Sequence, residues 1–289
     1  MSRELIRTIV DRHAPSPGRT KTPFEGVELF RVVAPFERMP GIYTPSVCAI
    51  VAGEKIVHVE DSIHVFGEDR YVCATLPTPV FANVRDASPD APLLGVIVEL
   101  HTNVMSQLVM ETRVAYGSVP TSDGPKKGFG TAVRDAQFDV ALARLLELLD
   151  DPPAARVLGP GRLRELFFAV VRGEAGDRLQ SDFGQAPALA TTLAHLHAHL
   201  SEDFSIDSLA RRAGMSRAVF DRQFKAATLQ SPLQYIKALR LNEASMLIAR
   251  GENIGEAATA VGYHNASQFS REFRRKFGTS PRDWARAAG

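Results

Sequence analysis

Short apolar runs dominate the first hundred residues of the chain, and helical periodicity dominates the rest. The runs are rich in β-branched residues, and most are separated by Gly, Pro or Asp. This pattern is typical of strands in a small antiparallel barrel or sandwich. The predicted strands cover residues 27–33, 46–52, 55–60, 62–67, 70–76, 79–85 and 92–100.

Amphipathic helical patterns follow these strands. Apolar residues recur at helical spacing in 101–113, 138–150 and 161–173, which predicts helices with one buried face. A looser stretch, 118–130, connects the first two of them. We therefore expect a first domain at 1–180, with a barrel at about 25–100 and helices at about 101–175. Its boundary with the next domain is predicted within 176–187.

The last hundred residues contain one pattern twice. Five positions recur 48 residues later and six recur 49 residues later, so that a single residue is inserted after the glycine. The matched pairs are Ile206/Ile254, Leu209/Ala257, Ala210/Ala258, Gly214/Gly262, Met215/Tyr263, Phe220/Phe269, Arg222/Arg271, Phe224/Phe273, Lys225/Arg274, Pro232/Pro281 and Tyr235/Trp284. Such self-similarity is a strong signal of a duplicated structural unit.

Each copy predicts a helix, a tight turn and a second helix. Gly214 and Gly262 suit the end of the first helix because glycine adopts the left-handed conformation without strain. Ser216 and Asn265 are good N-caps for the second helix, which buries two phenylalanines at i, i+4 and presents polar and basic residues outward. These are features of a helix-turn-helix. The sequence predicts two of them in an all-α domain at 188–289, at about 206–227 and 254–277.

A long amphipathic helix at 231–251 connects the two predicted units. Its buried side is expected to carry Leu233, Ile236, Leu239, Ala244, Leu247 and Ile248. A rigid helix of this kind can hold two recognition helices at a fixed separation, comparable with the roughly 34 Å between successive major-groove faces. One polypeptide could then contact two turns of DNA.

Charge is divided unevenly along the chain. From residue 191 onward there are 14 Lys and Arg against 9 Asp and Glu, a net charge of +5, whereas the first 190 residues carry −4. This asymmetry indicates that the C-terminal part meets a polyanion. The N-terminal twenty residues scatter charges among their apolar positions and lack the uninterrupted core of a signal peptide, so we expect a cytoplasmic protein without membrane association.

The C-terminal residues also resemble a known family. The segments 204–248 and 254–284 are similar to the DNA-binding domain of the AraC family of bacterial transcription regulators. The resemblance implies two helix-turn-helix units that bind double-stranded promoter DNA, usually as an activator acting on RNA polymerase. The segments VCAIVAGEKIVH and 155–180 resemble the N-terminal domain of one AraC subgroup. That resemblance implies a cupin-like barrel with helices, an α+β chain overall, binding of a small-molecule effector, and a possible homodimer.

The family's DNA-contacting positions carry over residue by residue. The resemblance places base contacts at Ala218, Asp221 and Arg222 of the first recognition helix, and at Ala266, Ser267, Gln268, Ser270 and Arg271 of the second. The two alanines are too short to hydrogen-bond a base, which leaves Arg222, Gln268 and Arg271 as the stronger candidates. Phosphate contacts are expected from Arg217, Lys225, Arg274, Arg275 and Lys276.

An enzyme of another class remains an alternative. A cupin-type metalloenzyme, with the C-terminal helices serving only assembly, would need a metal site in the barrel. The candidates His58, Glu60, His64 and His101 lack the usual spacing, and His195 and His199, one helical turn apart, have no evident third ligand. We therefore expect no metal, no cofactor and no catalysis. A binding module without any ligand, regulated by its abundance, is a third possibility.

Cysteine chemistry is a further open alternative. Cys48 and Cys73 are the two cysteines of the chain, each within an apolar predicted strand, where cysteine usually acts as a small hydrophobic residue. We expect them to be reduced thiols. The AraC subgroup that the chain resembles includes regulators that respond to reactive aldehydes, so thiol sensing by either residue stays a hypothesis.

Overall fold

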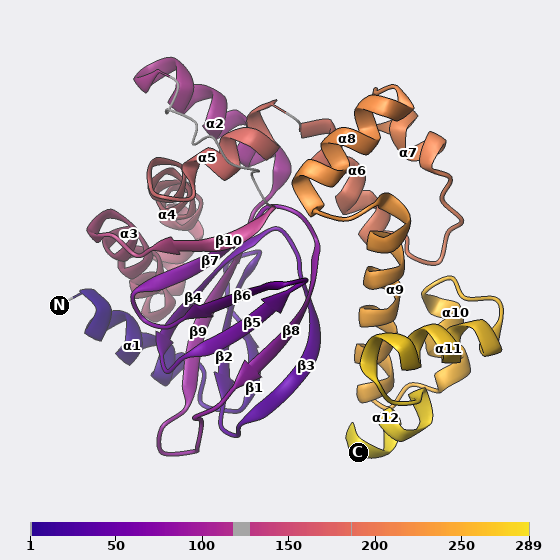
Figure 1. The fold of residues 1–289 in the computed structure, drawn as a ribbon. Helices are drawn as coiled ribbons and strands as arrows, with labels where there is room; N and C mark the ends of the chain where they lie inside the picture. Colours follow the sequence, from indigo (N-terminus) through magenta and orange to yellow (C-terminus); the bar gives the residue numbers. More distant parts are fainter. Residues whose placement is uncertain (1, 118–127, 186, 289) are drawn as a thin grey trace.

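The computed structural model describes residues 2–117, 128–185 and 187–288. Two antiparallel sheets with helices on one side form the N-terminal part, and helices alone form the C-terminal part, as Figure 1 shows. The predicted α+β class is therefore confirmed. No helix in the described ranges is both long and apolar enough to cross a membrane.

The strands form a six-stranded and a four-stranded sheet, in the orders β1-β2-β9-β4-β7-β10 and β3-β8-β5-β6. Their bounds are β1 Gly18–Lys21, β2 Val27–Val32, β3 Phe36–Tyr43, β4 Ser46–Ala52, β5 Lys55–Val59, β6 Ser62–Phe66, β7 Arg70–Ala74, β8 Thr78–Val84, β9 Leu93–Glu99 and β10 Phe129–Val133. All seven predicted strands are present, within two residues at each end. Three strands, β1, β3 and β10, were not predicted.

The two sheets, together called the barrel below, enclose an apolar interior. Its members come from alternate positions of both sheets, including Cys48, Val57, Val72 and Val80. Gly95 on β9 leaves room for this packing, because an added Cβ would lie 2.2 Å from the ring of Phe30. The interior is thus filled by side chains that point inward from every second position of the strands.

Helices cover the outer face of the six-stranded sheet (Figure 1). They are α1 Ser2–His13, α2 Thr102–Tyr116, α3 Ala136–Glu147, α4 Pro152–Arg172 and α5 Gly176–Leu179. The three predicted helices correspond to α2, α3 with its 3₁₀ extension, and α4. Helix α4 begins nine residues before the predicted start, because Pro160 and its two neighbouring glycines lie inside the helix. Gly159 packs against Phe24 at a distance that a Cβ would occupy.

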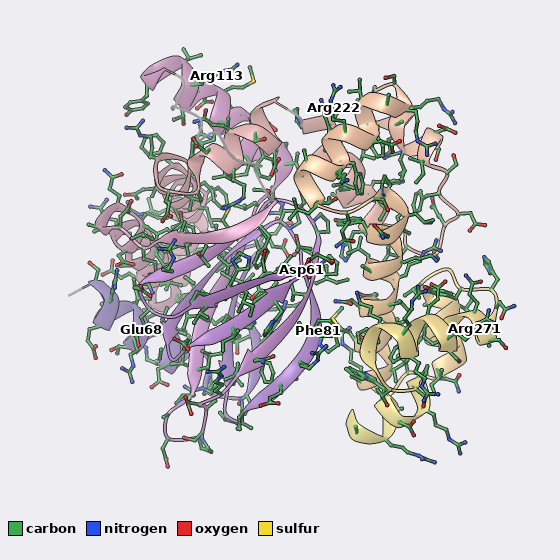
Figure 2. The ribbon with its side chains drawn as sticks, in the orientation of Figure 1. Asp61, Glu68, Phe81, Arg113, Arg222 and Arg271 are labelled. Carbon is green, nitrogen blue, oxygen red and sulfur yellow. The ribbon has the colours of Figure 1, made fainter. Side chains whose placement is uncertain are left out.

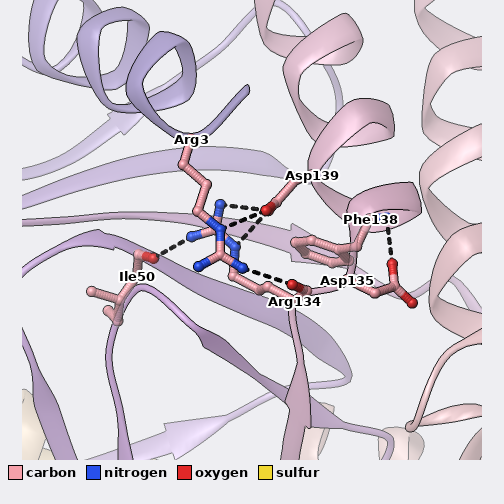
Figure 3. Close-up of polar contacts among 6 residues, drawn as sticks. All are labelled: Arg3, Ile50, Arg134, Asp135, Phe138 and Asp139. Atoms are coloured by element: carbon pink, nitrogen blue, oxygen red, sulfur yellow. Dashed lines mark hydrogen bonds and ion pairs between the residues drawn. The ribbon is translucent and has the colours of Figure 1, made fainter. Parts of the chain in front are cut away.

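An ion-pair cluster fixes α1, which was not predicted, to the rest of the N-terminal part (Figure 3). Arg3 donates from Nε to Asp139 Oδ2 at 2.7 Å and from Nη2 to the carbonyl oxygen of Arg134 at 2.7 Å. The buried Arg134 binds Asp139 Oδ1 and donates to the carbonyl oxygen of Ile50 at 2.7 Å. The cluster therefore joins α1, α3 and β4 through two guanidinium groups that share the Asp139 carboxylate.

The two predicted connections differ in the structure. Residues 118–127 of the looser stretch lie outside the described residues, and its last two residues begin β10. The predicted boundary at 176–187 contains α5 and the π-helical turn Gln180–Gln185. Leu179 and Phe183 of this segment are buried in the core under the six-stranded sheet. The N-terminal core therefore extends further along the chain than the helix predicted to end at residue 173.

The C-terminal part consists of α6 Pro187–Ala198, α7 Ile206–Arg212, α8 Arg217–Thr228, α9 Pro232–Ala249, α10 Ile254–Ala260, α11 Ala266–Phe277 and α12 Pro281–Ala288. Helices α7 and α8 lie near one end of α9, and α10 and α11 near the other (Figure 1). The linker helix α9 is buried on more faces than predicted, because it contacts both helix-turn-helix units and the barrel. Leu233, predicted as buried, is 59% exposed and forms no part of either core.

Candidate nucleic-acid interface

Each helix-turn-helix unit has a small core of its own. Phe220 and Phe224 are fully buried in the first, and Phe269 and Phe273 in the second. Within each pair the ring centroids lie 5.4 Å apart. The i, i+4 phenylalanines therefore fix the inner face of each second helix, and the residues between them face outward as predicted.

The turns have the conformation that the glycines predict. Gly214 has φ +65° and Gly262 has φ +84°, in the left-handed region. Asn265 caps α11 by accepting a hydrogen bond from the backbone N–H of Gln268 at 3.0 Å. Ser216 occupies the N-cap position of α8, but its side chain forms no capping hydrogen bond. The duplicated turn is thus confirmed, with a weaker cap in the first copy.

The outward face of α8 carries two free basic side chains. Arg222 and Lys225 are exposed, and neither forms an ion pair within the described part of the chain. Arg217, in contrast, bridges Asp221 and Asp207 with N–O distances of 3.0 Å each. These hydrogen bonds raise the pKa of Arg217. Asp221 and Arg217 therefore partly neutralise each other, and Arg222 is the free basic group among the predicted base-contacting residues of this helix.

The outward face of α11 is larger and more basic. Its exposed side chains are Ser267, Gln268, Ser270, Arg271, Arg274 and Arg275. The three arginines have no ion-pair partner among residues 2–117, 128–185 and 187–288. Figure 2 shows Arg222 and Arg271 at separate ends of the helical region. The matched arginines of the two copies thus occupy equivalent outward positions on two different helices.

A hydrogen-bonded group joins α11 to the linker helix. Glu272 accepts from Lys237 Nζ at 2.9 Å, from the Tyr263 hydroxyl at 2.7 Å and from Gln268 Nε2 at 3.3 Å. Burial alone would raise the pKa of Glu272, but these donors outweigh it and lower the pKa. This group was not predicted from the sequence. The feature that could have revealed it is Glu272 itself, an acidic residue on an otherwise basic recognition helix.

Lys276 differs from the other predicted phosphate contacts. Its Nζ lies 6.0 Å from the centroids of the Phe81 and Phe277 rings, between α11 and strand β8. Burial lowers the pKa of Lys276, and the nearby Glu60 opposes this shift. Lys276 therefore points toward the barrel and lies apart from the outward basic face.

The linker helix sets the distance between the recognition helices. Helix α9 has 18 residues, which corresponds to about 27 Å at a rise of 1.5 Å per residue. A capping box at Ser231 and Gln234 and Pro232 at the first position fix its start. With the recognition helices extending beyond its ends, this length is compatible with the roughly 34 Å between successive major-groove faces.

The same linker helix is docked on the barrel. The Tyr235 hydroxyl donates to the carbonyl oxygen of Pro77. Asn242, 1% exposed, donates from Nδ2 to the carbonyl oxygens of Gly41 at 2.9 Å and Val80 at 3.1 Å. Helix α9 thereby contacts the strands β3 and β8 of the four-stranded sheet. The helix that connects both helix-turn-helix units is therefore hydrogen-bonded directly to the backbone of the barrel.

Two further contacts complete the docking. Phe81 of β8, labelled in Figure 2, packs edge-on against Phe277 of α11 with centroids 5.7 Å apart. Gln230 Nε2 donates to Glu60 at the β5–β6 turn. A cavity of about 30 Å³ lies between the barrel and the first unit, lined among others by Phe129 and Tyr235. It has room for one or two water molecules.

The two thiols lie on opposite faces of the six-stranded sheet. Cys48 faces the barrel interior, whereas Cys73 faces the helices. Burial raises the pKa of the Cys48 thiol despite the nearby Lys55, and raises that of Cys73 to about 11 despite Arg178. Both thiols therefore remain protonated near neutral pH, which disfavours nucleophilic attack. Both basic neighbours come from other elements, Lys55 from β5 and Arg178 from α5, so neither is evident from the sequence around the cysteines.

The barrel histidines do not converge. His64 pairs with Val57 on the interior face and lies edge-on to Phe129 at 5.1 Å, whereas His58 occupies the opposite face of its strand. His101 precedes α2 at the far end of β9. Among the described residues, no group of three His, Cys, Asp or Glu side chains is placed to hold a metal ion.

The histidine pair at the end of α6, with His195 in the helix and His199 in the turn after it, has an intramolecular explanation. The rings of His195 and His199 lie 4.1 Å apart, and His199 Nδ1 is 2.8 Å from the carbonyl oxygen of His195. Burial lowers the pKa of His195, and the charges of Arg212 and His199 lower it further. This contact between the rings and the backbone accounts for the pair without a ligand.

Comparison with known proteins agrees with this arrangement. Over 99 residues the chain is 34% identical to the HTH-type transcriptional regulator AlkR of Acinetobacter baylyi, covering 34% of this chain and 32% of AlkR. Over 143 residues it is 29% identical to the HTH-type transcriptional activator RhaS of Escherichia fergusonii, covering 48% of this chain and 51% of RhaS. The chain thus spans between a third and a half of the length of these relatives.

A solved structure shares the fold over nearly the whole chain. ToxT from Vibrio cholerae O395, bound to (E)-4-(8-methylnaphthalen-1-yl)but-3-enoic acid, has a TM-score of 0.58 at 9% identity, covering 91% of this chain and 98% of ToxT. Residues 209–287 match the model of a helix-turn-helix domain. Residues 23–178, more than half of the chain, match the model of the AraC-type transcriptional regulator N-terminus. The chain therefore belongs to the AraC family of transcriptional regulators.

Proposed function

We propose that the protein is a sequence-specific regulator of transcription that binds double-stranded promoter DNA through both helix-turn-helix units. The observation that carries this proposal is the pair of matched arginines. Arg222 and Arg271 occupy equivalent exposed positions on α8 and α11, without ion-pair partners in the described ranges. Two helix-turn-helix units held by the linker helix α9 can contact two successive turns of DNA.

Arg222 and Arg271 are proposed to contact bases. An arginine side chain can donate two hydrogen bonds to guanine O6 and N7, worth about 1–3 kcal/mol of discrimination. Weaker base contacts are proposed for four residues beside these arginines, namely Asp221, Ser267, Gln268 and Ser270. For Asp221 this requires release from Arg217, to which it is now bonded.

Lys225, Arg274 and Arg275 are proposed to contact phosphates, which add affinity without sequence information. Arg217 can join them only by exchanging its carboxylate partners for phosphates. Lys276 can do so only if α11 separates from the barrel. Selection of DNA from a random pool by the full chain tests the proposal. Recovery of one sequence motif supports it, and recovery of unrelated sequences alone contradicts it.

The barrel is proposed to bind a small-molecule effector. Its apolar interior adjoins the linker helix through β3 and β8, so a change there can alter the position of the recognition helices. ToxT, which shares the fold, was solved with an organic acid bound. Allosteric coupling of this kind is typically about 1–3 kcal/mol. Thermal-shift screening of organic compounds tests this, and a complete lack of stabilising compounds counts against it.

Activation, rather than repression, is proposed from the relative RhaS, a transcriptional activator. This role requires contact with RNA polymerase in the cytoplasm, and a homodimer formed through the N-terminal helices would pair two such chains. In vitro transcription from a selected site, with and without the protein, distinguishes an increase from a decrease in transcript. Light scattering of the full chain determines whether it is a monomer or a dimer.

A further inference from the structure

A lysine side chain extends into the apolar interior of the barrel. Lys55 begins β5, on the same face of the strand as Val57 and Val59, which belong to the interior core. Its Nζ lies 5.3 Å from the ring centroid of Tyr43 and 5.9 Å from that of Phe30. The cation is thus placed between two aromatic faces.

Two polar groups at this place lack a strong partner. No acceptor lies within hydrogen-bonding or ion-pair distance of the Lys55 amine among the described residues. The Tyr43 hydroxyl is buried, and its one polar neighbour among the described residues is the Cys48 thiol, a weak hydrogen-bonding group. Buried polar groups nearly always have good partners, so an amine without an acceptor beside a hydroxyl with only a thiol for a neighbour needs an explanation.

The charged surroundings favour an added negative group. The titratable groups facing Lys55 are the Cys48 thiol on β4, Arg19 on β1 and the Tyr43 hydroxyl on β3. Burial lowers the pKa of Lys55, the Cys48 thiol opposes this, and Arg19 lowers it further. Arg19 is paired with Glu28 at 3.2 Å, and no carboxylate of the described residues forms an ion pair with Lys55. An anion at this point would therefore restore the charged form of the amine.

We propose that the barrel binds a small organic carboxylate, whose charged end is held by the Lys55 amine and the Tyr43 hydroxyl and whose apolar body packs against the surrounding rings. Both groups can act as donors, so an acceptor-rich anion satisfies them better than a neutral or cationic ligand. This inference deepens the effector proposal above and depends on that proposal for its regulatory meaning.

The same aromatic cluster leads to the contact with the DNA-binding part. The ring of Phe129 lies 5.3 Å edge-on from Tyr43 and lines the cavity beside Tyr235. That cavity of about 30 Å³ is too small for an organic ligand. A carboxylate whose body extends in this direction must therefore move side chains at the junction between the barrel and α9. Binding would thereby alter the docking of the linker helix.

Calorimetric titration of the full chain with octanoate and 4-phenylbutanoate, against the corresponding primary amides, tests the proposal. We expect the acids to bind and the amides to bind about 10- to 150-fold more weakly, as for the loss of a hydrogen bond to a charged group. Lys55→Met should weaken acid binding by a similar factor and leave amide binding unchanged. Tyr43→Phe should have a smaller effect, and Lys55→Arg should restore part of the affinity.

Proton linkage gives a second readout that a purely structural role would not change. Titrations in buffers of different ionisation enthalpy should show proton uptake on acid binding as pH rises through the lowered pKa of Lys55, and this uptake should be absent in Lys55→Met. Circular dichroism verifies that each variant is folded. Equal affinity for acids and amides, or no binding of any acid, overturns the proposal.

A covalent alternative is tested separately, by incubating the same protein variants with a carbonyl compound and borohydride. If a carbonyl compound is fixed to Lys55 after borohydride reduction while the acids do not bind, the amine captures carbonyls instead, and the carboxylate proposal is wrong. None of these titrations contains DNA. A negative result in the titrations therefore does not contradict the DNA-binding proposal. A negative result in the DNA selection likewise does not contradict the carboxylate proposal.

Discussion

Asn242→Ala tests whether the linker helix is held on the barrel by the contacts described above. The side chain is buried and supplies two hydrogen bonds, to the carbonyl oxygens of Gly41 and Val80, that connect α9 to β3 and β8. Alanine suits a helix and removes both donors without adding bulk. The variant thus weakens the junction while leaving both helix-turn-helix cores in place.

The expected loss of docking free energy follows from the two carbonyl oxygens that the substitution leaves without a donor. A buried acceptor left without a donor costs about 1–3 kcal/mol. The Asn242 Oδ1 atom has no hydrogen-bond partner among the described residues, so its removal offsets part of this cost. We therefore expect a net loss of about 1–3 kcal/mol in the free energy of docking, a factor of about 5 to 150 in the docking equilibrium.

Hydrogen–deuterium exchange of the full chain measures this loss. Peptides that cover β3 and the middle of α9 should exchange faster in Asn242→Ala, by a factor within that range, while peptides of α3 remain unchanged. Leu233→Ala on the exposed side of the same helix is the matched control and should behave as wild type. Unchanged exchange in β3 and α9 would refute the conclusion that Asn242 holds the junction.

Three further predictions concern stability and reactivity. Phe224→Ala and Phe273→Ala should each lower the free energy of unfolding by about 3–5 kcal/mol in denaturant titrations, since both rings are fully buried; losses below 1 kcal/mol would contradict the two-core description. Glu272→Gln should lower the free energy of unfolding at pH 7. The difference in unfolding free energy from wild type should shrink as pH falls below about 4.3 and through the lowered pKa of Glu272, and a difference that stays constant would show that the charge is not involved. Cys48 and Cys73 should react with iodoacetamide at neutral pH only after unfolding, as measured by mass spectrometry; rapid native labelling would revive thiol sensing.

Much of the architecture could be predicted because local pattern and tertiary role agree. The central strands of the six-stranded sheet are short apolar runs because both of their faces are buried, as in the fully buried β4. The duplicated helix-turn-helix repeats both its core and its turn. Strand β3 was missed because its sequence, FERMPGIY, is interrupted by two charged residues and by Pro40 and Gly41. Proline is tolerated there because β3 is an edge strand with an irregular register between Phe36 and Met39.

Long-range contacts limited the prediction of the candidate sites. Nothing local in the sequence distinguishes Asn242 from a surface residue of the linker helix, or Lys55 from a solvated residue after a turn. Their roles arise when β3 and β8 meet α9, and when Tyr43 and Phe30 close over the amine. Similarly, Lys276 matched the basic pattern of its helix, and its position toward Phe81 depends on the docking of the barrel.

The most direct test of the central claim is a dimethyl sulfate interference experiment on a selected DNA site with the full chain. The claim is that Arg222 and Arg271 contact bases in two successive major grooves. Wild type should show two clusters of interfering guanines about 10 base pairs apart. Arg222→Ala should abolish one cluster and Arg271→Ala the other, whereas Lys225→Ala should keep both and reduce the salt dependence of binding by about one unit of slope. If both arginine variants retain both clusters, these helices do not read the DNA as we propose.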